Sequence, residues 1–243
     1  MNILGVTYDN LTFQQALERA LSFAEKEGKF NVFFLNLDCL RQALKDREYK
    51  EVLAASSLLL PDGVGLKLAT AMFGGRMREN CNGTDFSPAF MEELAKRNLK
   101  IFLMGSKNGV AEMAAENLKR KIKNIQIVGA VSGFFTDDEK IISAINASGA
   151  DVLFVAMGVP RQERWIHMNR ASLNPKICLG VGALLDYLSG SLPRAPRGLR
   201  SLHLEWLWRI GLEPGRMFKR YILDGMGFLF KLFFYRLKAL FRT

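Results

Sequence analysis

The chain of 243 residues has few cysteines and histidines and no long uncharged apolar run. Its three cysteines, Cys39, Cys81 and Cys178, are scattered and form neither a disulfide framework nor a zinc-binding pattern. No apolar run approaches the roughly 20 residues that a membrane-spanning helix needs, and the first residues lack the basic and apolar regions of a secretion signal. These absences predict a cytoplasmic protein with reduced thiols, which would lie on a membrane rather than cross it.

Complete nucleotide-binding and metal-binding motifs are also missing. There is no P-loop, and no Asp-X-Asp pair could hold Mg²⁺ or Mn²⁺ against a diphosphate. Gly63-Val64-Gly65 and Gly180-Val181-Gly182 begin like a dinucleotide fingerprint, but Leu68 and Leu185 stand where its third glycine is required. We therefore expect no metal and no other cofactor, and an NAD-dependent oxidoreductase is only weakly supported.

Short apolar runs alternate with amphipathic stretches of helical period as far as Gly190. The predicted strands are Val32–Asn36, Ser57–Leu60, Lys100–Met104, Ile125–Val131, Asp151–Met157 and Lys176–Val181. The predicted helices are Thr12–Glu27, Leu40–Ala54, Gly65–Phe73, Asp85–Arg97, Gly109–Ile122, Thr136–Ala147 and Arg161–Ser172. Since parallel strands need a crossover that travels back along the sheet, this alternation predicts an α/β, Rossmann-like fold: a parallel sheet with helices on both faces.

Polar residues and glycines repeatedly follow the predicted strands. They are Asn36, Pro61-Asp62-Gly63, Gly105-Ser106, Gly158 and Gly182. In open α/β sheets the ligand crevice lies outside the carboxyl ends of the strands. These positions therefore predict one ligand site along that rim.

The pattern changes after Gly190, where Pro193 and Pro196 hinder helix formation. We place a boundary near residue 193, between an α/β domain over residues 1–193 and a helical appendage over residues 194–243, which is called the tail below. Within the tail one helix is expected from Leu199 to Leu212. The chain then breaks near Glu213-Pro214-Gly215, and a second helix begins near Arg216.

The tail is basic and aromatic. It contains eleven Lys and Arg against three Asp and Glu, so eight of the ten net positive charges lie there, with ten of the 26 aromatic residues. Basic side chains interleaved with large aromatics suit a surface that is anionic outside and apolar beneath, as a phospholipid leaflet is. Nucleic acid is the alternative partner, because it too attracts basic and stacking side chains.

The last stretch of the tail, residues 225–242, has two faces on a helical wheel. Its basic stripe comprises Lys231, Tyr235, Lys238 and Arg242, and its apolar face comprises Leu229, Phe233, Leu237 and Leu240. We expect Lys231, Phe233, Lys238 and Arg242 to contact an anionic membrane surface. The alternative is that the apolar face packs on the α/β domain. The phosphates of a nucleic acid would not bury that apolar face, which counts against nucleic acid as the partner of the tail.

Asp62 follows Leu58-Leu59-Leu60 in a turn formed by Pro61 and Gly63. A carboxylate held in such a turn at the end of a strand suits a fixed general base. The same position also suits a cap on the helix that begins near Gly65. The residues alone leave both interpretations open.

Two further segments could contact a ligand at the rim. Gly105-Ser106-Lys107-Asn108-Gly109 follows a strand and opens a helix, so it is either a phosphate site or an ordinary turn. Gln162 and Glu163 lie in the first turn of the helix that follows Pro160. An amide and a carboxylate there suit a hydroxyl-rich ligand, although Glu163 could instead complement the helix dipole.

Several segments of this chain occur in the same order and spacing in a known family. They are Asn36, Pro61-Asp62-Gly63-Val64-Gly65, Asn82-Gly83-Thr84-Asp85-Phe86, Met104-Gly105-Ser106, Gly158 to Trp165, Gly180 to Asp186, Arg194-Ala195-Pro196, Leu204 to Arg209, and Glu213-Pro214-Gly215-Arg216. Over almost its whole length the chain resembles the bacterial glycosyltransferases of the WecG/TagA/CpsF type, typified by the wall teichoic acid N-acetylmannosaminyltransferase. Many members have Glu-Arg-Val-Thr-Gly where this chain has Glu79-Asn80-Cys81-Asn82-Gly83.

This resemblance implies an inverting transfer of a sugar in cell-envelope or exopolysaccharide synthesis. N-acetylmannosamine or a related hexose would pass from a UDP-sugar donor to a polyprenyl-diphosphate-linked acceptor, an undecaprenyl-linked saccharide, on the cytoplasmic side of the plasma membrane. Asp62 is then the expected base. Without a metal motif, Arg209, Arg216 and Arg220 of the tail are the available partners for the diphosphate, because a guanidinium pairs phosphate oxygens bidentately.

The remaining expected contacts to sugar or nucleotide are Asn36, Gly105, Ser106, Gln162 and Glu163. Thr84 and Asp85 more simply cap the next helix, and Asp186 suits a structural role as well as a place in the site. The identity of the sugar and the oligomeric state stay open, with a homo-oligomer possible through the apolar face of the tail. A nucleic-acid-binding α/β protein and an NAD-dependent oxidoreductase are the alternative functions.

Overall fold

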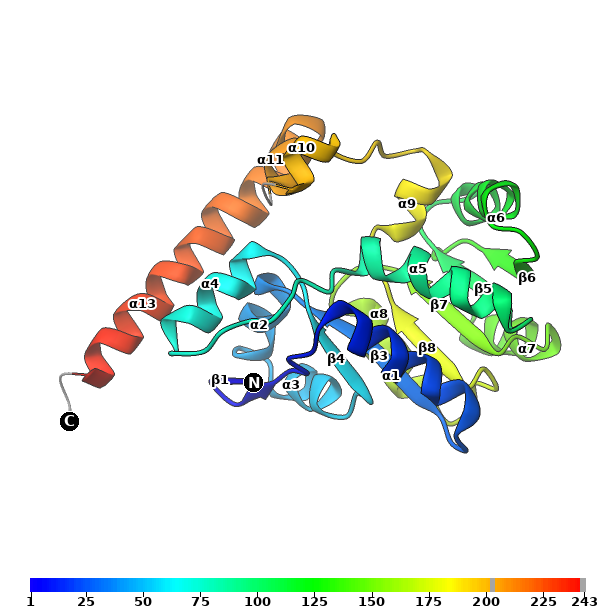
Figure 1. Ribbon diagram of the computed structural model, residues 1–243, viewed down its shortest axis with the longest axis horizontal. Helices are drawn as coiled ribbons and strands as arrows, with labels where there is room; N and C mark the ends of the chain where they lie inside the picture. The colour runs from blue at the N-terminus through cyan, green and yellow to red at the C-terminus, as the bar shows by residue number, and fades with distance from the viewer. Residues whose placement is uncertain (202–203, 241–243) are drawn as a thin grey trace.

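The computed structural model describes residues 1–201 and 204–240. In that part of the chain six parallel strands form one sheet in the order β4-β3-β8-β7-β5-β6 (Figure 1). The strands are β3 (Phe30–Leu35), β4 (Leu58–Pro61), β5 (Lys100–Gly105), β6 (Gln126–Val131), β7 (Val152–Ala156) and β8 (Ile177–Gly180). Each overlaps a predicted strand, so the predicted parallel α/β fold is confirmed.

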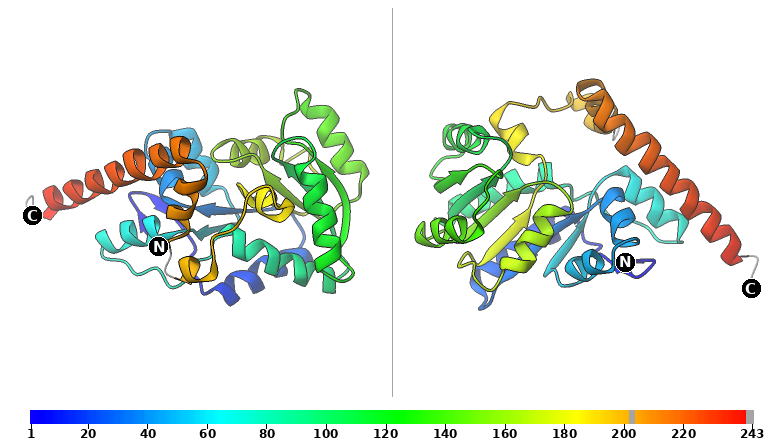
Figure 2. Two further views of the ribbon diagram at one scale, coloured as in Figure 1. Left: turned by 90° about the horizontal axis from the view of Figure 1, so that it is seen from above. Right: turned by 180° about the vertical axis from the view of Figure 1, so that it is seen from behind.

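Helices cover both faces of the sheet, and a short hairpin precedes them (Figures 1 and 2). One face packs against α1 (Phe13–Glu25), α5 (Gly83–Lys96), α6 (Val110–Lys121) and α9 (Leu184–Ser189). The other packs against α2 (Leu37–Ala43), α3 (Arg47–Ala54), α4 (Val64–Met72), α7 (Asp138–Ala147) and α8 (Arg161–Asn169). The hairpin, β1 (Asn2–Ile3) and β2 (Val6–Thr7), was not predicted.

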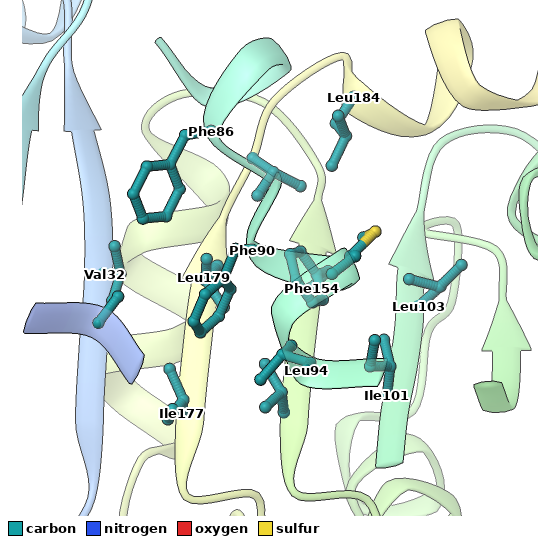
Figure 3. Packing of buried hydrophobic residues seen from close by; sticks show 14 of the residues in the cluster. Val32, Phe86, Phe90, Leu94, Ile101, Leu103, Phe154, Ile177, Leu179 and Leu184 are labelled. Atoms are coloured by element: carbon teal, nitrogen blue, oxygen red, sulfur yellow. The ribbon is translucent and has the colours of Figure 1, made fainter. Parts of the chain in front are cut away.

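Aromatic side chains of α5 occupy the middle of the first face (Figure 3). The ring of Phe90 lies 5.8 Å from that of Phe86 and 6.4 Å from that of Phe154 on β7. All three side chains are fully buried, and burying each contributes about 1.5–3 kcal/mol. Their packing fixes the sheet beneath α5 and so fixes the rim at which β4, β5, β7 and β8 end.

The predicted helix Leu40–Ala54 is wrong as a single element, because the chain turns within it. Asn36 accepts a hydrogen bond from the backbone N–H of Cys39 and so starts α2 earlier than expected. Asp46 accepts one from the backbone N–H of Tyr49 and starts α3. Each capping side chain satisfies an N–H that would otherwise lack a partner, so two short helices replace one.

The tail forms a series of helices. They are α10 (Arg197–Ser201), α11 (Glu205–Leu212), α12 (Pro214–Phe218), the π-helix η1 (Lys219–Met226) and α13 (Gly227–Leu240). The predicted break near Glu213-Pro214-Gly215 is confirmed, with Pro214 in the first turn of α12. The expected helix from Leu199 to Leu212 is instead divided between α10 and α11.

Helix α13 lies beside α4 and packs partly on the body of the protein (Figures 1 and 2). Leu232 is only 3% exposed, and Phe228 and Leu229 pack against the same buried cluster. Phe233 is 47% exposed, and Phe230 and the lysine Lys231 are exposed as well. The face of α13 that contacts the body therefore differs from the predicted apolar face. It includes Leu229, as predicted, but Phe233 points outward.

Of the other predicted membrane contacts, Lys238 is exposed, and Arg242 lies outside the described residues. Within residues 1–201 and 204–240, no helix combines the length and the apolar character required to span a bilayer.

Candidate functional site

A cleft of about 1490 Å³ lies at the carboxyl ends of the strands and is walled on one side by the tail. From the α/β domain it is lined by the expected residues Asn36, Asp62, Ser106 and Gln162. From the tail it is lined by Arg209, Arg216 and Arg220. The fold thus brings the predicted base and the three predicted arginines to one space, although up to 158 residues separate them in sequence. Gly105 and Glu163 lie behind its surface.

Asp62 stands in a turn that is held by backbone hydrogen bonds. Its own N–H donates to the carbonyl of Leu35 at 2.8 Å, and the N–H of Gly63 donates to Asn80 Oδ1 at 2.7 Å. Asn80 occupies the position at which many relatives have the arginine of Glu-Arg-Val-Thr-Gly. The helix α4 is capped by Gly63 without any side-chain hydrogen bond, so the alternative reading of Asp62 as a helix cap is wrong.

Among the residues that the structure describes, the carboxylate of Asp62 lies close to several charges but forms an ion pair with none of them. Burial raises its pKa to about 6; Glu205 raises it further, while Arg220 and Arg209 lower it. No side-chain hydrogen bond to this carboxylate is present within the described residues, and none is among the main influences on its pKa. At neutral pH the group is therefore mostly ionised and available to accept a proton.

Arg220 is held at the cleft by a group of charges that joins the tail to α2. Its Nε lies 3.5 Å from Asp38 Oδ2, and the guanidinium of Arg41 lies 2.7 Å from Asp38 Oδ1. Arg41 also lies 3.9 Å from Asp224, one turn beyond Arg220. Asp38 therefore bridges an arginine of the body and an arginine of the tail.

A second group of contacts joins the start of the tail to α5 and α9. Arg194 lies 2.8 Å from Asp85 and 3.4 Å from Glu205. Its guanidinium and that of Arg209 lie near the ring of Tyr187, at 5.7 and 5.8 Å from the centroid. Arg209 is thereby packed against an aromatic ring of the body, and this contact restricts the positions that its guanidinium can adopt.

Arg216 is freer than the other two tail arginines. Its Nε donates to Glu213 Oε2 at 2.6 Å, one helical turn away, and its side chain remains 67% exposed. Within residues 1–201 and 204–240 no residue of the α/β domain forms an ion pair or a hydrogen bond with Arg216, so it can swing toward a ligand at little cost.

Gln162 ties together two loops of the rim. Its Oε1 accepts hydrogen bonds from the N–H groups of Gly158 and Gly182, at 3.1 and 2.8 Å. Its Nε2 donates to Glu163 Oε1 at 2.6 Å, and the Tyr49 hydroxyl donates weakly to the other carboxylate oxygen at 3.5 Å. Glu163 therefore supports Gln162 from below, and burial raises the pKa of this carboxyl to about 7.

Gly105 and Ser106 form the end of β5. A Cβ on Gly105 would meet the backbone of Ala156 at 2.3–2.6 Å, so only glycine allows the two strands to approach here. Ser106 adopts a left-handed backbone with φ 56°, and its Oγ donates to Asp186 Oδ1. Asp186 thus lines the cleft beside Ser106, an arrangement that its position in the sequence left open.

The remaining rim residues divide between capping and the cleft. Asn36 uses Oδ1 to cap α2 while the residue lines the cleft. The expectation that Thr84 or Asp85 caps α5 is wrong, because Asn82 Oδ1 accepts from the N–H of Asp85. Asp85 instead pairs with Arg194.

Sequence reasoning missed Asp38, Arg41 and Arg194. The spacing of Asp38 and Arg41 is that of an i, i+3 pair on a helix, which could have been recognised. Their link to Arg220 crosses from α2 to η1 and left no signal in the sequence. In the part of the chain that the structure covers, no group of three His, Cys, Asp or Glu could hold a metal ion.

This geometry is that of a Rossmann-like α/β protein whose ligand cleft lies at the carboxyl ends of its strands. The model of the glycosyl transferase WecG/TagA/CpsF family matches residues 1–242. The chain therefore belongs to this glycosyltransferase family, as its motifs suggested. Membership favours sugar transfer over the nucleic-acid-binding and oxidoreductase alternatives.

Curated relatives share one name, N-acetylglucosaminyldiphosphoundecaprenol N-acetyl-beta-D-mannosaminyltransferase. The one from Bacillus subtilis (strain 168) is 33% identical over 174 residues, which cover 72% of this chain and 68% of the relative. The one from Staphylococcus aureus (strain MRSA252) is 28% identical over 219 residues, covering 89% and 86%.

The link from Asp38 to Arg220 predicts that Asp38→Asn will loosen the tail. Removing the shared carboxylate takes from Arg220 its partner on α2 and leaves Arg41 with the more distant Asp224, at a cost of about 1 kcal/mol for partly exposed pairs. Limited trypsin digestion should then cleave after Arg216, Lys219 or Arg220 about fivefold faster than in the native protein.

Glu93→Gln is the matched control, since Glu93 pairs only with Lys96 and Arg97 of its own helical segment. Equal cleavage rates in the native protein and Asp38→Asn would show that Asp38 does not hold the tail.

Proposed function

We propose that this protein transfers N-acetylmannosamine or a related hexose from a UDP-sugar to an undecaprenyl-diphosphate-linked saccharide, with inversion at the anomeric carbon. The observation that carries the proposal is one cleft in which a half-buried carboxylate, which forms no ion pair with any described residue, faces tail arginines. The names of the relatives supply the substrate class, because they specify an undecaprenyl-diphosphate-linked N-acetylglucosamine as acceptor and a β-linked N-acetylmannosamine as the group transferred.

In the proposed reaction the ionised Asp62 accepts the proton of the acceptor hydroxyl. The acceptor oxygen then bonds to the anomeric carbon of the donor from the side opposite UDP. The bond between that carbon and the β-phosphate oxygen breaks, and its electron pair leaves on UDP. One bond forms and one breaks in a single displacement, so the configuration at this carbon is inverted.

The departing UDP gains a negative charge that the site must stabilise. In our proposal Arg209, Arg216 and Arg220 meet this charge, since guanidinium groups stay ionised and pair phosphate oxygens in a fork. Arg220 and Arg209 are already held at the cleft before any ligand arrives. Groups placed in advance need no rearrangement as charge develops, which makes them more effective.

We further propose that the protein works on the cytoplasmic face of the plasma membrane as a peripheral protein, with α13 on the lipid surface. Lys231, Phe233 and Lys238 are exposed, as are Phe230 and Phe234. Cations and aromatics together on one exposed helix suit the interface of an anionic leaflet. This placement would hold the cleft near a lipid-linked acceptor.

The role of Asp62 predicts that Asp62→Asn will abolish turnover. A panel of UDP-sugars with a polyprenyl-diphosphate N-acetylglucosamine acceptor, with products identified by mass, should give a disaccharide lipid with the native protein. The variant should lose about 10²–10⁴-fold in kcat, the contribution of a general base. The native rate should rise with pH through about 6 and then level, because Asp62 must be ionised.

The stability of this variant separates a lost base from a lost fold. Burial raises the pKa of Asp62 from 3.8 to about 6, so ionising it lowers the stability of the native protein as pH rises across that range. At pH 7.5 Asp62→Asn should therefore melt at the same temperature as the native protein or higher. Near-native turnover in this variant would assign the base elsewhere.

The role of the tail arginines predicts a specific loss in Arg220→Ala. Without the guanidinium, kcat should fall about 100-fold, as when one charge-stabilising donor is removed. Arg220→Lys should recover only part of this loss, since an ammonium cannot pair two oxygens. Arg236→Ala, on the exposed side of α13, should leave kcat unchanged, and an equal effect of the two alanine variants would refute the assignment.

Membrane binding is expected to depend on the lysines of α13. Each basic residue near an anionic leaflet contributes about 1 kcal/mol, so reversing both charges in Lys231→Glu/Lys238→Glu should weaken binding to phosphatidylglycerol vesicles at least about tenfold. Lys121→Glu/Lys123→Glu reverses two charges on the α/β domain and should bind normally. Vesicle binding that ignores the first pair, or salt-sensitive binding to oligonucleotides alone, would contradict this placement.

A further inference from the structure

One end of the cleft is apolar and lies between the tail and the helix that follows Asp62. It is lined by Leu37 of α2, Val64 and Leu68 of α4, Met226 of η1 and Leu229 of α13. These five residues are called the trough below. The proposed reaction at Asp62 uses none of them, so the trough needs its own explanation.

Helices α4 and α13 form the walls of the trough and leave the rim in the same direction (Figures 1 and 2). At the near end, Gly225 lies next to Leu37, since a Cβ built on this glycine would be in ordinary van der Waals contact with the leucine side chain, at 3.7 Å. At the far end, the ring of Phe73 lies 6.4 Å from that of Tyr235. Leu37 therefore forms the floor near the rim, and the two helices stay together along the length of α4.

Both walls change from polar to apolar in the same sense. On one side Asp62 comes first, and Val64 and Leu68 follow along α4. On the other side Arg220 comes first, and Met226 follows six residues later along the π-helix η1. A ligand that fits has an anionic group at Arg220 and a hydrocarbon chain that points away from Asp62.

The apolar side chains of the trough are incompletely covered. Leu68 and Met226 are each 47% exposed, while Leu229 is partly buried against the core. A hydrocarbon chain between them would remove this surface from water, which is favourable by about 25 cal/mol per Å². Arg220 supplies a cation at the near end for the same ligand: its Nε lies 3.5 Å from Asp38, which also pairs with Arg41, and Arg41 lies 3.9 Å from Asp224 as well.

We infer that the trough binds the first isoprene units of the polyprenyl acceptor and thereby orients its diphosphate toward Arg220 and its sugar toward Asp62. This inference rests on the proposed function and adds a binding site for the lipid within the protein. The acceptor is then recognised as an amphiphile, by its hydrocarbon as well as by its sugar and diphosphate.

The lipid surface itself is a poorer occupant of the trough. The exposed aromatics of α13, Phe230 at 59% and Phe234 at 59% exposure, lie outside the cleft lining and provide a separate surface for the bilayer. Within the trough the apolar residues are continuous with the arginines of the cleft, which fits a single chain that ends in a diphosphate.

The inference is tested by comparing two soluble acceptors that differ only in hydrocarbon. These are the farnesyl and methyl esters of N-acetylglucosaminyl diphosphate, titrated calorimetrically into the full-length protein without vesicles and below the micelle concentration of the farnesyl ester. The native protein should bind the farnesyl ester at least about tenfold more tightly, a gain of the size expected from burying part of one or two isoprene units.

Leu68→Gln/Met226→Gln should remove most of this preference. Both side chains are half exposed, so the fold should tolerate the change. The Kd of the farnesyl ester should rise about tenfold, whereas that of the methyl ester should change by less than about twofold, because it has no chain to bury. Met113→Gln alters a methionine of α6 with 52% exposure and should leave both values as in the native protein.

Equal affinities of the native protein for the two esters would overturn the inference, as would a preference that survives in Leu68→Gln/Met226→Gln. Turnover of the same esters with the UDP-sugar panel is measured separately. Failure of turnover with intact farnesyl preference would contradict the proposed reaction and leave the lipid site standing. Turnover of both esters without any preference for the farnesyl ester would support the proposed reaction and contradict the lipid site.

Discussion

The site depends on one half-buried carboxylate that lies beside cations without being neutralised by them. A direct ion pair would hold the pKa of Asp62 low and occupy its oxygens. Here burial raises the pKa to about 6, with a smaller contribution from Glu205 and against the opposing effect of Arg220 and Arg209. The turn is held by hydrogen bonds to its neighbours: the N–H of Asp62 donates to Leu35, the N–H of Gly63 donates to Asn80, and the carbonyl of Pro61 accepts from Cys81. Asp38 contributes as well, because it engages Arg220 and so keeps that guanidinium from closing directly on Asp62.

The tail is part of the site as well as an extension of the molecule. Arg194, Arg209 and Arg220 reach residues of the α/β domain, and Leu232 is buried against it. The side of α13 that faces away remains aromatic and basic. In the function proposed above, one segment would therefore supply charge to the chemistry, one wall of the lipid site and the surface that meets the bilayer. Coupling these roles would restrict reaction to acceptors at the membrane.

The strands were predictable because strands of a parallel sheet are buried on both faces and appear in the sequence as short apolar runs. The clustering of Asn36, Asp62, Ser106 and Gln162 followed from the rule that such strands end at one edge. Predictions from local patterns failed where more than one nearby side chain could accept a hydrogen bond from the N–H groups at the start of a helix. Asp46 divided one expected helix, Asn82 took the cap expected of Thr84 or Asp85, and Asp62 capped nothing.

The sequence by itself determined the order of strands and helices, the family and the concentration of charge in the tail, since periodicity, motif spacing and composition are written along the chain. Only the tertiary structure decided that Asp38 links α2 to η1, that Glu163 supports Gln162 from below, and that Phe233 faces outward while Leu232 is buried. The physical reason is that periodicity identifies an apolar face but not its partner. The partner is settled when α4 and α13 pack and desolvate each other's side chains.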